Sequence, residues 1–263
     1  MVLTGYGINC DEETRFAFEC AGAQSQIVHV NDAIANPALL ESAQILAFPG
    51  GFSYGDNLGS GNAFANKVRN KLWDSLLRFV EEEKLVIGIC NGFQIIANLG
   101  LVPAQGKQYG EKQIGLMHND NHLYTCRWVD VKACNDSPWL KGIETLMLPI
   151  AHGEGKVFAG AHVMKGLNEK NQVALKYFKG PVCTAQNLPF NPNGALEDIA
   201  GITDESGRVL GLMPHPERAV FFSQYPDWTL QKERLIRAGK PVPTEGNGLQ
   251  VFRNAVRYVQ EKR

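Results

Sequence analysis

A cysteine flanked by two glycines is the residue best placed in this sequence to act as a nucleophile. Cys90 lies in the G-I-C-N-G stretch of residues 88–92, between an apolar run and an amphipathic helical pattern that continues to Leu99. A strained strand-to-helix turn that exposes a nucleophile needs neighbours without bulky side chains. The start of a helix also favours a thiolate and leaves the backbone N–H of Asn91 free to face an oxyanion. The motif predicts a nucleophilic Cys90; the alternative is a buried structural cysteine.

His215 is the histidine best suited to serve such a thiol as a base. It follows an apolar, strand-like run and has a carboxylate, Glu217, two residues further on. In an extended backbone, positions i and i+2 share a face, so Glu217 can hold the imidazole. The proline on each side of His215 restricts the local backbone. The pattern predicts a Cys90–His215–Glu217 triad in which the acid orients the base, the alternative being a proline-rich loop with incidental polar residues.

Two further glycines could supply a second N–H group to the oxyanion. Gly50 and Gly51 follow the apolar run 43–48, and without side chains their backbone can approach a substrate closely. A glycine loop can instead bind phosphate, but the sequence has no G-x-x-x-x-G-K-[ST] motif. His118 and His122 have no third ligand at a matching spacing, so no metal site is predicted.

The elements that would position these residues alternate between strand and helix in the first hundred residues. Apolar runs predict strands at 2–6, 26–30, 43–48 and 85–90. Helical patterns lie between them, the longest from Phe64 to Glu83. This alternation predicts an α/β fold: a flavodoxin-like open, mostly parallel sheet with helices on both faces.

The second half of the sequence is richer in strand patterns. They fall at 123–131, 146–150, 156–158, 172–178, 199–203 and 209–213. A last amphipathic helix is predicted from Gly246 onward, and the segment 221–243 predicts a surface excursion with a basic, helix-like stretch at 230–237. No repeat or linker interrupts the pattern, so residues 1–263 are predicted to form a single domain.

The bulk composition is typical of a globular protein without nucleic-acid or membrane partners. The 263 residues are 44% hydrophobic and 20% charged, and the formal net charge is −1. No apolar run approaches the roughly 18 residues that a membrane-spanning helix needs, and no signal-peptide pattern is found at the N-terminus. Six scattered cysteines without a C-x-x-C pair predict free thiols and a cytoplasmic location.

The motifs together resemble those of class I, triad-type glutamine amidotransferases. Within that family, the sequence is most similar to the glutaminase subunits of phosphoribosylformylglycinamidine synthase, an enzyme of de novo purine synthesis. Four blocks that carry the resemblance occur in the family order, at 48–56, 88–94, 149–155 and 213–219. The Asn-Cys-Asp sequence at 9–11 also fits. The combination is far more specific than any one block.

The resemblance implies the following chemistry. Cys90 attacks the carboxamide of glutamine and forms a glutamyl thioester. His215, held by Glu217, protonates the departing ammonia and then activates water. The expected enzyme is therefore a glutaminase, a glutamine amidotransferase component that supplies ammonia to a C–N ligase.

The resemblance also implies how the substrate is held. Gly51 and the backbone of Asn91 would form the oxyanion hole, Gln94 would help to bind glutamine, and the region of Asn119 would contact its amino-acid end. The family usually reads N-x-S-x-[KR]-F in that region, and this sequence departs from it at the third and fifth positions of 119–124.

Partner chains are implied as well. The complete reaction consumes ATP, but the sequence has no recognisable nucleotide site, so no cofactor is expected here. ATP and Mg²⁺ are expected on a separate synthetase subunit that receives the ammonia, and a small bridging subunit is the other expected partner. Two alternatives remain open: a cysteine hydrolase of another glutamine-amidotransferase-like branch, or a non-catalytic subunit of the same assembly.

Overall fold

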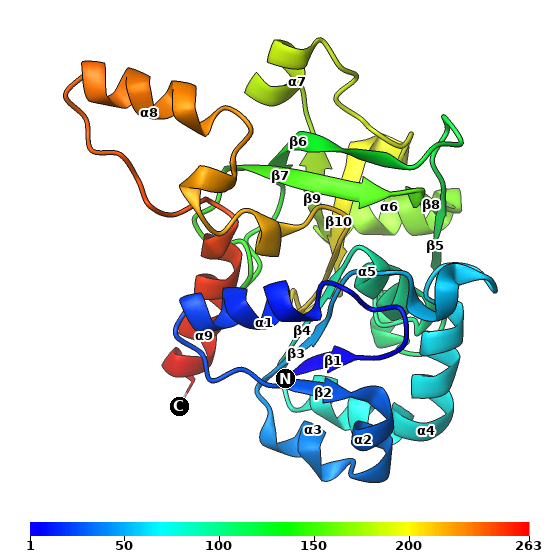
Figure 1. Ribbon diagram of the computed structural model, residues 1–263. Helices are drawn as coiled ribbons and strands as arrows, with labels where there is room; N and C mark the ends of the chain where they lie inside the picture. Colours follow the sequence, from blue (N-terminus) through cyan, green and yellow to red (C-terminus); the bar gives the residue numbers. More distant parts are fainter. Residues whose placement is uncertain (263) are drawn as a thin grey trace.

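A parallel block of five strands forms one half of the central sheet. The computed structural model describes residues 1–262, and its main sheet has nine strands in the order β2-β1-β3-β4-β11-β10-β9-β6-β7 (Figure 1). The parallel strands are β1 (Val2–Thr4), β2 (Ile27–His29), β3 (Ile45–Phe48), β4 (Leu85–Ile89) and β11 (Val209–Leu212). All five residues of β4 are buried, which explains its uninterrupted apolar sequence.

The other half of the sheet is antiparallel. It consists of β10 (Ile199–Thr203), β9 (Val173–Tyr177), β6 (Thr125–Ala133) and β7 (Thr145–His152). A separate two-stranded sheet pairs β5 (Ile114–His118) with β8 (Glu154–Ala159). The predicted α/β class and the β-rich second half are therefore confirmed, and β5 is a strand that the sequence pattern did not predict.

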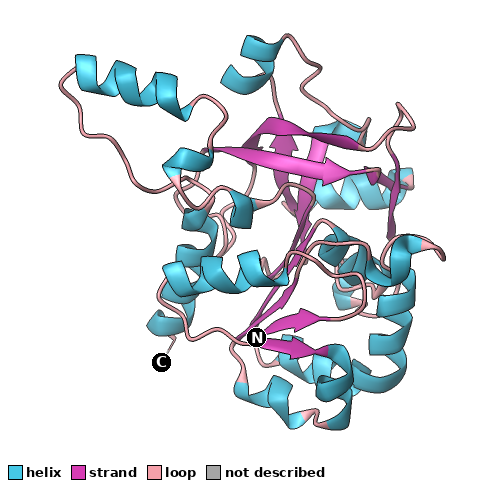
Figure 2. Ribbon diagram, viewed as in Figure 1, coloured by secondary structure: helices cyan, strands magenta, loops and turns pink. Residues whose placement is uncertain are grey.

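Helices cover both faces of the parallel block, as predicted (Figure 2). On one face, α1 (Asp11–Cys20) packs against α9 (Leu249–Glu261), where the rings of Phe18 and Phe252 meet edge to face at 4.9 Å. On the other face lie α4 (Asn62–Glu81) and α5 (Asn91–Asn98). The remaining helices are α2 (Val30–Ala35), α3 (Ala38–Ser42), α6 (Ala161–Glu169), α7 (Pro181–Gln186) and α8 (Trp228–Arg237).

The excursion predicted at 221–243 contains α8. This helix projects from the rest of the molecule (Figure 1), and none of its residues is buried. The α8 part of the segment is thus on the surface, as expected, whereas Phe222 and Tyr225 before it are buried. None of the helices within residues 1–262 combines the length and the apolar character required to cross a membrane. The assignment of residues 1–263 to a single domain stays a prediction.

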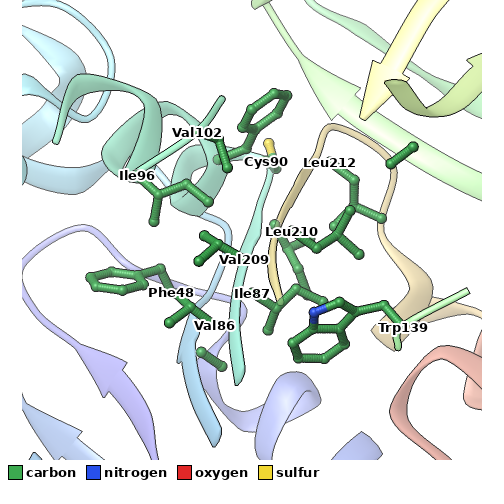
Figure 3. Packing of buried hydrophobic residues seen from close by; sticks show 14 of the residues in the cluster. Phe48, Val86, Ile87, Cys90, Ile96, Val102, Trp139, Val209, Leu210 and Leu212 are labelled. Atoms are coloured by element: carbon green, nitrogen blue, oxygen red, sulfur yellow. The ribbon is translucent and has the colours of Figure 1, made fainter. Parts of the chain in front are cut away.

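The apolar core lies on both sides of the β4–β11 pair. Figure 3 shows Val86 and Ile87 of β4 beside Val209 and Leu210 of β11, with Cys90 beyond the end of β4. Trp139 closes this region; its side chain is fully buried and its Nε1 donates to the carbonyl of Arg208 at 2.9 Å. The core therefore fixes the two strands whose ends carry the predicted nucleophile and base.

Candidate active site

Cys90 occupies the sharp turn between β4 and α5. Its backbone angles, φ 51° and ψ −108°, are uncommon for a residue with a side chain, as expected for a nucleophile held in a strained corner. A Cβ atom on Gly92 would lie 1.7 Å from the carbonyl oxygen of Phe48, and one on Gly88 would lie 2.6 Å from that of Gly92. The chain can form this corner only because both flanking residues are glycines.

The parallel pairing of β4 with β11 brings His215 to the same end of the sheet as Cys90. Ile89 pairs with Leu212, so Cys90 follows one strand while Met213, Pro214 and His215 follow its neighbour. The backbone N–H of His215 donates to the carbonyl of Pro149 at 2.8 Å, which ties this segment to β7. Figure 3 shows the sulfur of Cys90 near Leu212.

Glu217 holds the imidazole of His215. Its Oε1 lies 2.6 Å from Nδ1, and the two side chains are 0% and 2% exposed. Burial by itself would lower the pKa of His215, but the Glu217 carboxylate, together with the thiol groups of Cys90 and Cys10, outweighs it and raises that pKa well above its ordinary value. The His215 ring is therefore an imidazolium at neutral pH, suited to give a proton to a leaving group.

The oxyanion hole predicted from the N–H groups of Gly51 and Asn91 stays a prediction, and both residues lie in segments that adjoin Cys90. Asn91 is the first residue of α5, so its N–H has no acceptor within the helix. Gly51 has a φ of 150°, and a Cβ atom there would lie 2.6 Å from the carbonyl oxygen of Gly7. The side chain of Asn91 joins the two segments, because its Oδ1 accepts from the N–H of Ser53 at 3.2 Å.

The two residues predicted to bind substrate have buried amides with protein partners. Gln94 is 4% exposed; its Nε2 donates to the carbonyl of Glu154 at 2.5 Å and its Oε1 accepts from Asn91 at 2.8 Å. Asn119 is 0% exposed and donates to the carbonyls of Leu123 and His152 at 3.0 and 2.8 Å. Both side chains therefore brace the walls of the site, and their contact with substrate stays a prediction.

Comparison with known proteins identifies the fold and the family together. The model of the CobB/CobQ-like glutamine amidotransferase domain matches residues 1–259. The chain belongs to this glutamine amidotransferase family. The "phosphoribosylformylglycinamidine synthase subunit PurQ" of Methanococcus maripaludis is 48% identical over 98% of this chain and 96% of that protein. The protein of the same name from Dehalococcoides mccartyi is 43% identical over 99% and 97%.

A solved structure agrees with this assignment. The chain matches "Structure of PurLQS from Thermotoga maritima" with a TM-score of 0.71 and 30% identity, covering 98% of this chain and 97% of that one. A putative GMP synthase component from Thermoplasma acidophilum, at 13% identity and a TM-score of 0.52, shares the fold and covers 99% of this chain and 96% of that one. The resemblance found in the sequence is thus confirmed.

This glutamine amidotransferase also has a buried histidine that the sequence pattern did not single out. His152 is 2% exposed, and its Nδ1 lies 3.0 Å from Oδ1 of Asn119. Burial, and to a smaller degree the charge of His215, lowers the pKa of His152 to about 3, so the ring is neutral. Because the Asn119 oxygen can only accept, Nδ1 carries the proton. Its position in the 149–155 block was the only available signal.

A second thiol, Cys10, also lies in the site. Cys10 is 1% exposed and caps the start of α1, and its Sγ accepts from Nη2 of Arg218 at 3.0 Å. Sγ of Cys10, a ring nitrogen of His215 and a carboxylate oxygen of Glu217 all lie within 4.8 Å of one another. Nothing in the local sequence indicates this, because residues 10 and 215 meet only in the folded chain.

The turn that departs from the family pattern lies at the edge of the site. Asn121 stabilises it by accepting from the N–H of Leu123 at 3.0 Å and donating to Thr125 at 3.3 Å. Leu123 is 65% exposed, whereas the Tyr124 ring packs near that of Phe52, with centroids 6.0 Å apart. Asn121, the first departure, therefore has a structural role within the turn, and β6 begins two residues later than predicted.

Proposed function

We propose that this chain is the glutaminase subunit of a phosphoribosylformylglycinamidine synthase. It hydrolyses glutamine through a Cys90 thioester and supplies ammonia to a separate, ATP-dependent synthetase subunit in purine synthesis. The observation that carries the proposal is the placement of Cys90, on a strained strand-to-helix corner, at the same sheet end as the buried His215–Glu217 pair. The description of the matching family supports glutamine as the substrate, and the names of the relatives that match nearly the whole chain support the assembly.

The first half of the reaction releases ammonia. The thiolate of Cys90 attacks the side-chain carbonyl carbon of glutamine, forming a C–S bond and moving an electron pair to the oxygen. The N–H groups of Gly51 and Asn91 stabilise this oxyanion. The imidazolium of His215 then protonates the amide nitrogen, the C–N bond breaks and ammonia leaves.

The second half regenerates the thiolate. His215, now neutral, removes a proton from water while the resulting hydroxide adds to the thioester carbon. Collapse of this second oxyanion breaks the C–S bond and releases glutamate. Glu217 keeps the imidazole oriented in both halves, because it accepts the hydrogen bond from Nδ1 and leaves Nε2 for the chemistry. Each proton and electron pair in the two halves is thus accounted for by the substrate, water and the triad.

The proposal places the consumption of ATP on another chain. The sequence has no phosphate-binding lysine motif, so ATP and Mg²⁺ belong on the partner synthetase. The Thermotoga maritima structure, titled PurLQS, supports an assembly with a synthetase and a small bridging subunit. Six free cysteines support work in a reducing cytoplasm.

Covalent labelling tests the chemistry and the substrate together. Mass spectrometry after treatment with a chloroketone or diazo analogue of glutamine should find one adduct, on Cys90, and excess glutamine should prevent it. The matched control is Cys183→Ser, which removes an equally buried cysteine and should label as the wild type does. An adduct on another residue, or one that glutamine does not prevent, would refute the assignment.

Turnover with and without the partners tests the assembly. We expect slow glutamine hydrolysis by the chain alone and marked stimulation by the synthetase and bridging subunits with ATP. Cys90→Ala should abolish glutamine-dependent synthesis while the complex still uses added ammonium. Equal glutaminase turnover with and without the partner chains would contradict the proposal.

A further inference from the structure

Three potential metal ligands converge beside Gly50. A Cβ atom on Gly50 would lie 2.8 Å from Cε1 of His215, 3.0 Å from Sγ of Cys10 and 3.5 Å from Cβ of Cys90. The three side chains therefore surround one point in the structure. The N–H groups of Asn9 and Cys10 both donate to the carbonyl of Gly50, at 3.2 and 3.1 Å, which fixes Cys10 in this position.

The imidazole offers a free nitrogen to this point. Nδ1 of His215 is held by Glu217, while Nε2 is buried and has no hydrogen-bond partner within residues 1–262. A histidine that binds a metal through one nitrogen usually gives the other N–H to a carboxylate. The His215–Glu217 pair already has this arrangement. Two thiols and one imidazole are the donor set that Zn²⁺ prefers among the common divalent cations.

The spacing is close to that of a bound ion. Zn–S bonds of about 2.3 Å and Zn–N bonds of about 2.0 Å place tetrahedral ligand atoms roughly 3.5 Å apart. Sγ of Cys10 and a ring nitrogen of His215 are within 4.8 Å of each other, in a set whose third member is a carboxylate oxygen of Glu217. Cys90 approaches the same point with its Cβ, 3.5 Å from the Cβ position on Gly50. A movement of about 1 Å, within reach of side-chain rotation, would close the difference.

We propose that Cys10, Cys90 and His215 form a binding site for a thiophilic divalent cation such as Zn²⁺, whose binding blocks the active site reversibly. The cation would bind the sulfur nucleophile and, by displacing the proton on Nε2 of the His215 imidazolium, the base as well. Binding itself does not depend on the proposed glutaminase activity; only the resulting inhibition rests on it. Cys10 thereby acquires a role that the glutaminase reaction does not give it.

Two features help Cys10 to bind as a thiolate. The guanidinium of Arg218 donates to its sulfur at 3.0 Å, and the sulfur lies at the N-terminal end of the ten-residue helix α1. Because the ligands of the cation must be a thiolate and an unprotonated imidazole nitrogen, binding displaces the thiol proton of Cys10 and the Nε2 proton of His215.

Titration of the reduced protein with Co²⁺ tests binding without any measurement of activity. The wild type should develop thiolate-to-Co²⁺ charge-transfer absorption at one equivalent, and Zn²⁺ should remove it. The intensity of this band should fall by about half in Cys10→Ser, because one of the two thiolate ligands is lost. It should be unchanged in the control Cys183→Ser. Calorimetry should find one fewer proton released in Cys10→Ser.

Zn²⁺ inhibition of glutamine hydrolysis tests the consequence. For each protein, the Zn²⁺ concentration that halves its own uninhibited rate is measured. This concentration should be more than about tenfold higher for Cys10→Ser than for the wild type, and unchanged for Cys183→Ser. Absence of the charge-transfer band in the wild type would overturn the proposal even if Cys10→Ser failed to fold. A Cys10→Ser protein with the wild-type band would overturn it too. A charge-transfer band without inhibition would support the binding site but contradict the proposed block of the active site.

Discussion

The buried neutral His152 predicts a specific loss of stability in mild acid. Its pKa is about 3 in the folded protein, against an ordinary value of 6.5. Below pH 6.5 the unfolded chain therefore binds a proton at this position that the folded chain does not bind. A histidine with a lowered pKa contributes stability above 6.5 and loses that contribution as the pH falls.

The magnitude follows from the width of this interval. Each pH unit below 6.5 costs about 1.4 kcal/mol, so the contribution of His152 at pH 5 is a loss of about 2 kcal/mol. His215 contributes with the opposite sign. Its pKa is raised in the folded state, so its stabilising contribution is lost as the pH rises, and it cancels when two proteins that both carry His215 are compared.

The variant His152→Asn isolates the effect. An asparagine N–H can replace the Nδ1 proton that faces Asn119, but it does not titrate. Urea unfolding of both proteins between pH 7 and pH 5 should give a free energy of unfolding that falls about 2 kcal/mol further in the wild type than in the variant. Other groups, such as Asp56, titrate alike in both proteins and cancel. Parallel pH dependence in the two proteins would refute the neutral buried histidine.

Two substitutions test the corner and the dyad. Gly92→Ala should lower the free energy of unfolding by about 3 kcal/mol or more, because the new Cβ would lie 1.7 Å from a carbonyl oxygen. In the control Gly153→Ala the new Cβ would have no atom within 4 Å, so the free energy of unfolding should change by less than about 0.5 kcal/mol. Equal denaturation midpoints for the two variants would contradict this prediction. Glu217→Gln should reduce kcat roughly 100-fold. The alkaline limb of the pH–rate profile should also move to lower pH, because the carboxylate no longer raises the pKa of His215. An unshifted profile would show that Glu217 does not control the pKa of the base.

The proposed catalytic side chains could be singled out from sequence because their neighbours obey local rules. Gly88 and Gly92 are required by atoms within a few residues of Cys90 or at the end of the adjacent strand, and the i, i+2 spacing of His215 and Glu217 needs no tertiary information. The alternating pattern of the first hundred residues likewise predicted four of the five strands of the parallel block, but not that β11 joins it. Its boundaries were within a few residues of those observed.

The remaining features depend on contacts between distant segments. Cys10 has no local signal, and it approaches His215 only because α1 begins next to the Gly50 loop. His152 could be recognised as buried and neutral only once Asn119 was placed against it. Gln94 was predicted to hold substrate, but sequence could not reveal that its amide lies against Glu154. The short strand β5 lacks a clear alternation, with its last residues exposed.

The parallel contact between β4 and β11 also sets the order in which function can arise as the chain is made. Ile89 and Leu212 are neighbours in the sheet although more than a hundred residues separate them. A nascent chain that has not reached β11 carries the nucleophile without its base. Such non-local contacts form late because closing a long loop is entropically costly. Under the proposed mechanism, the growing polypeptide therefore releases no ammonia until β11 has joined the sheet.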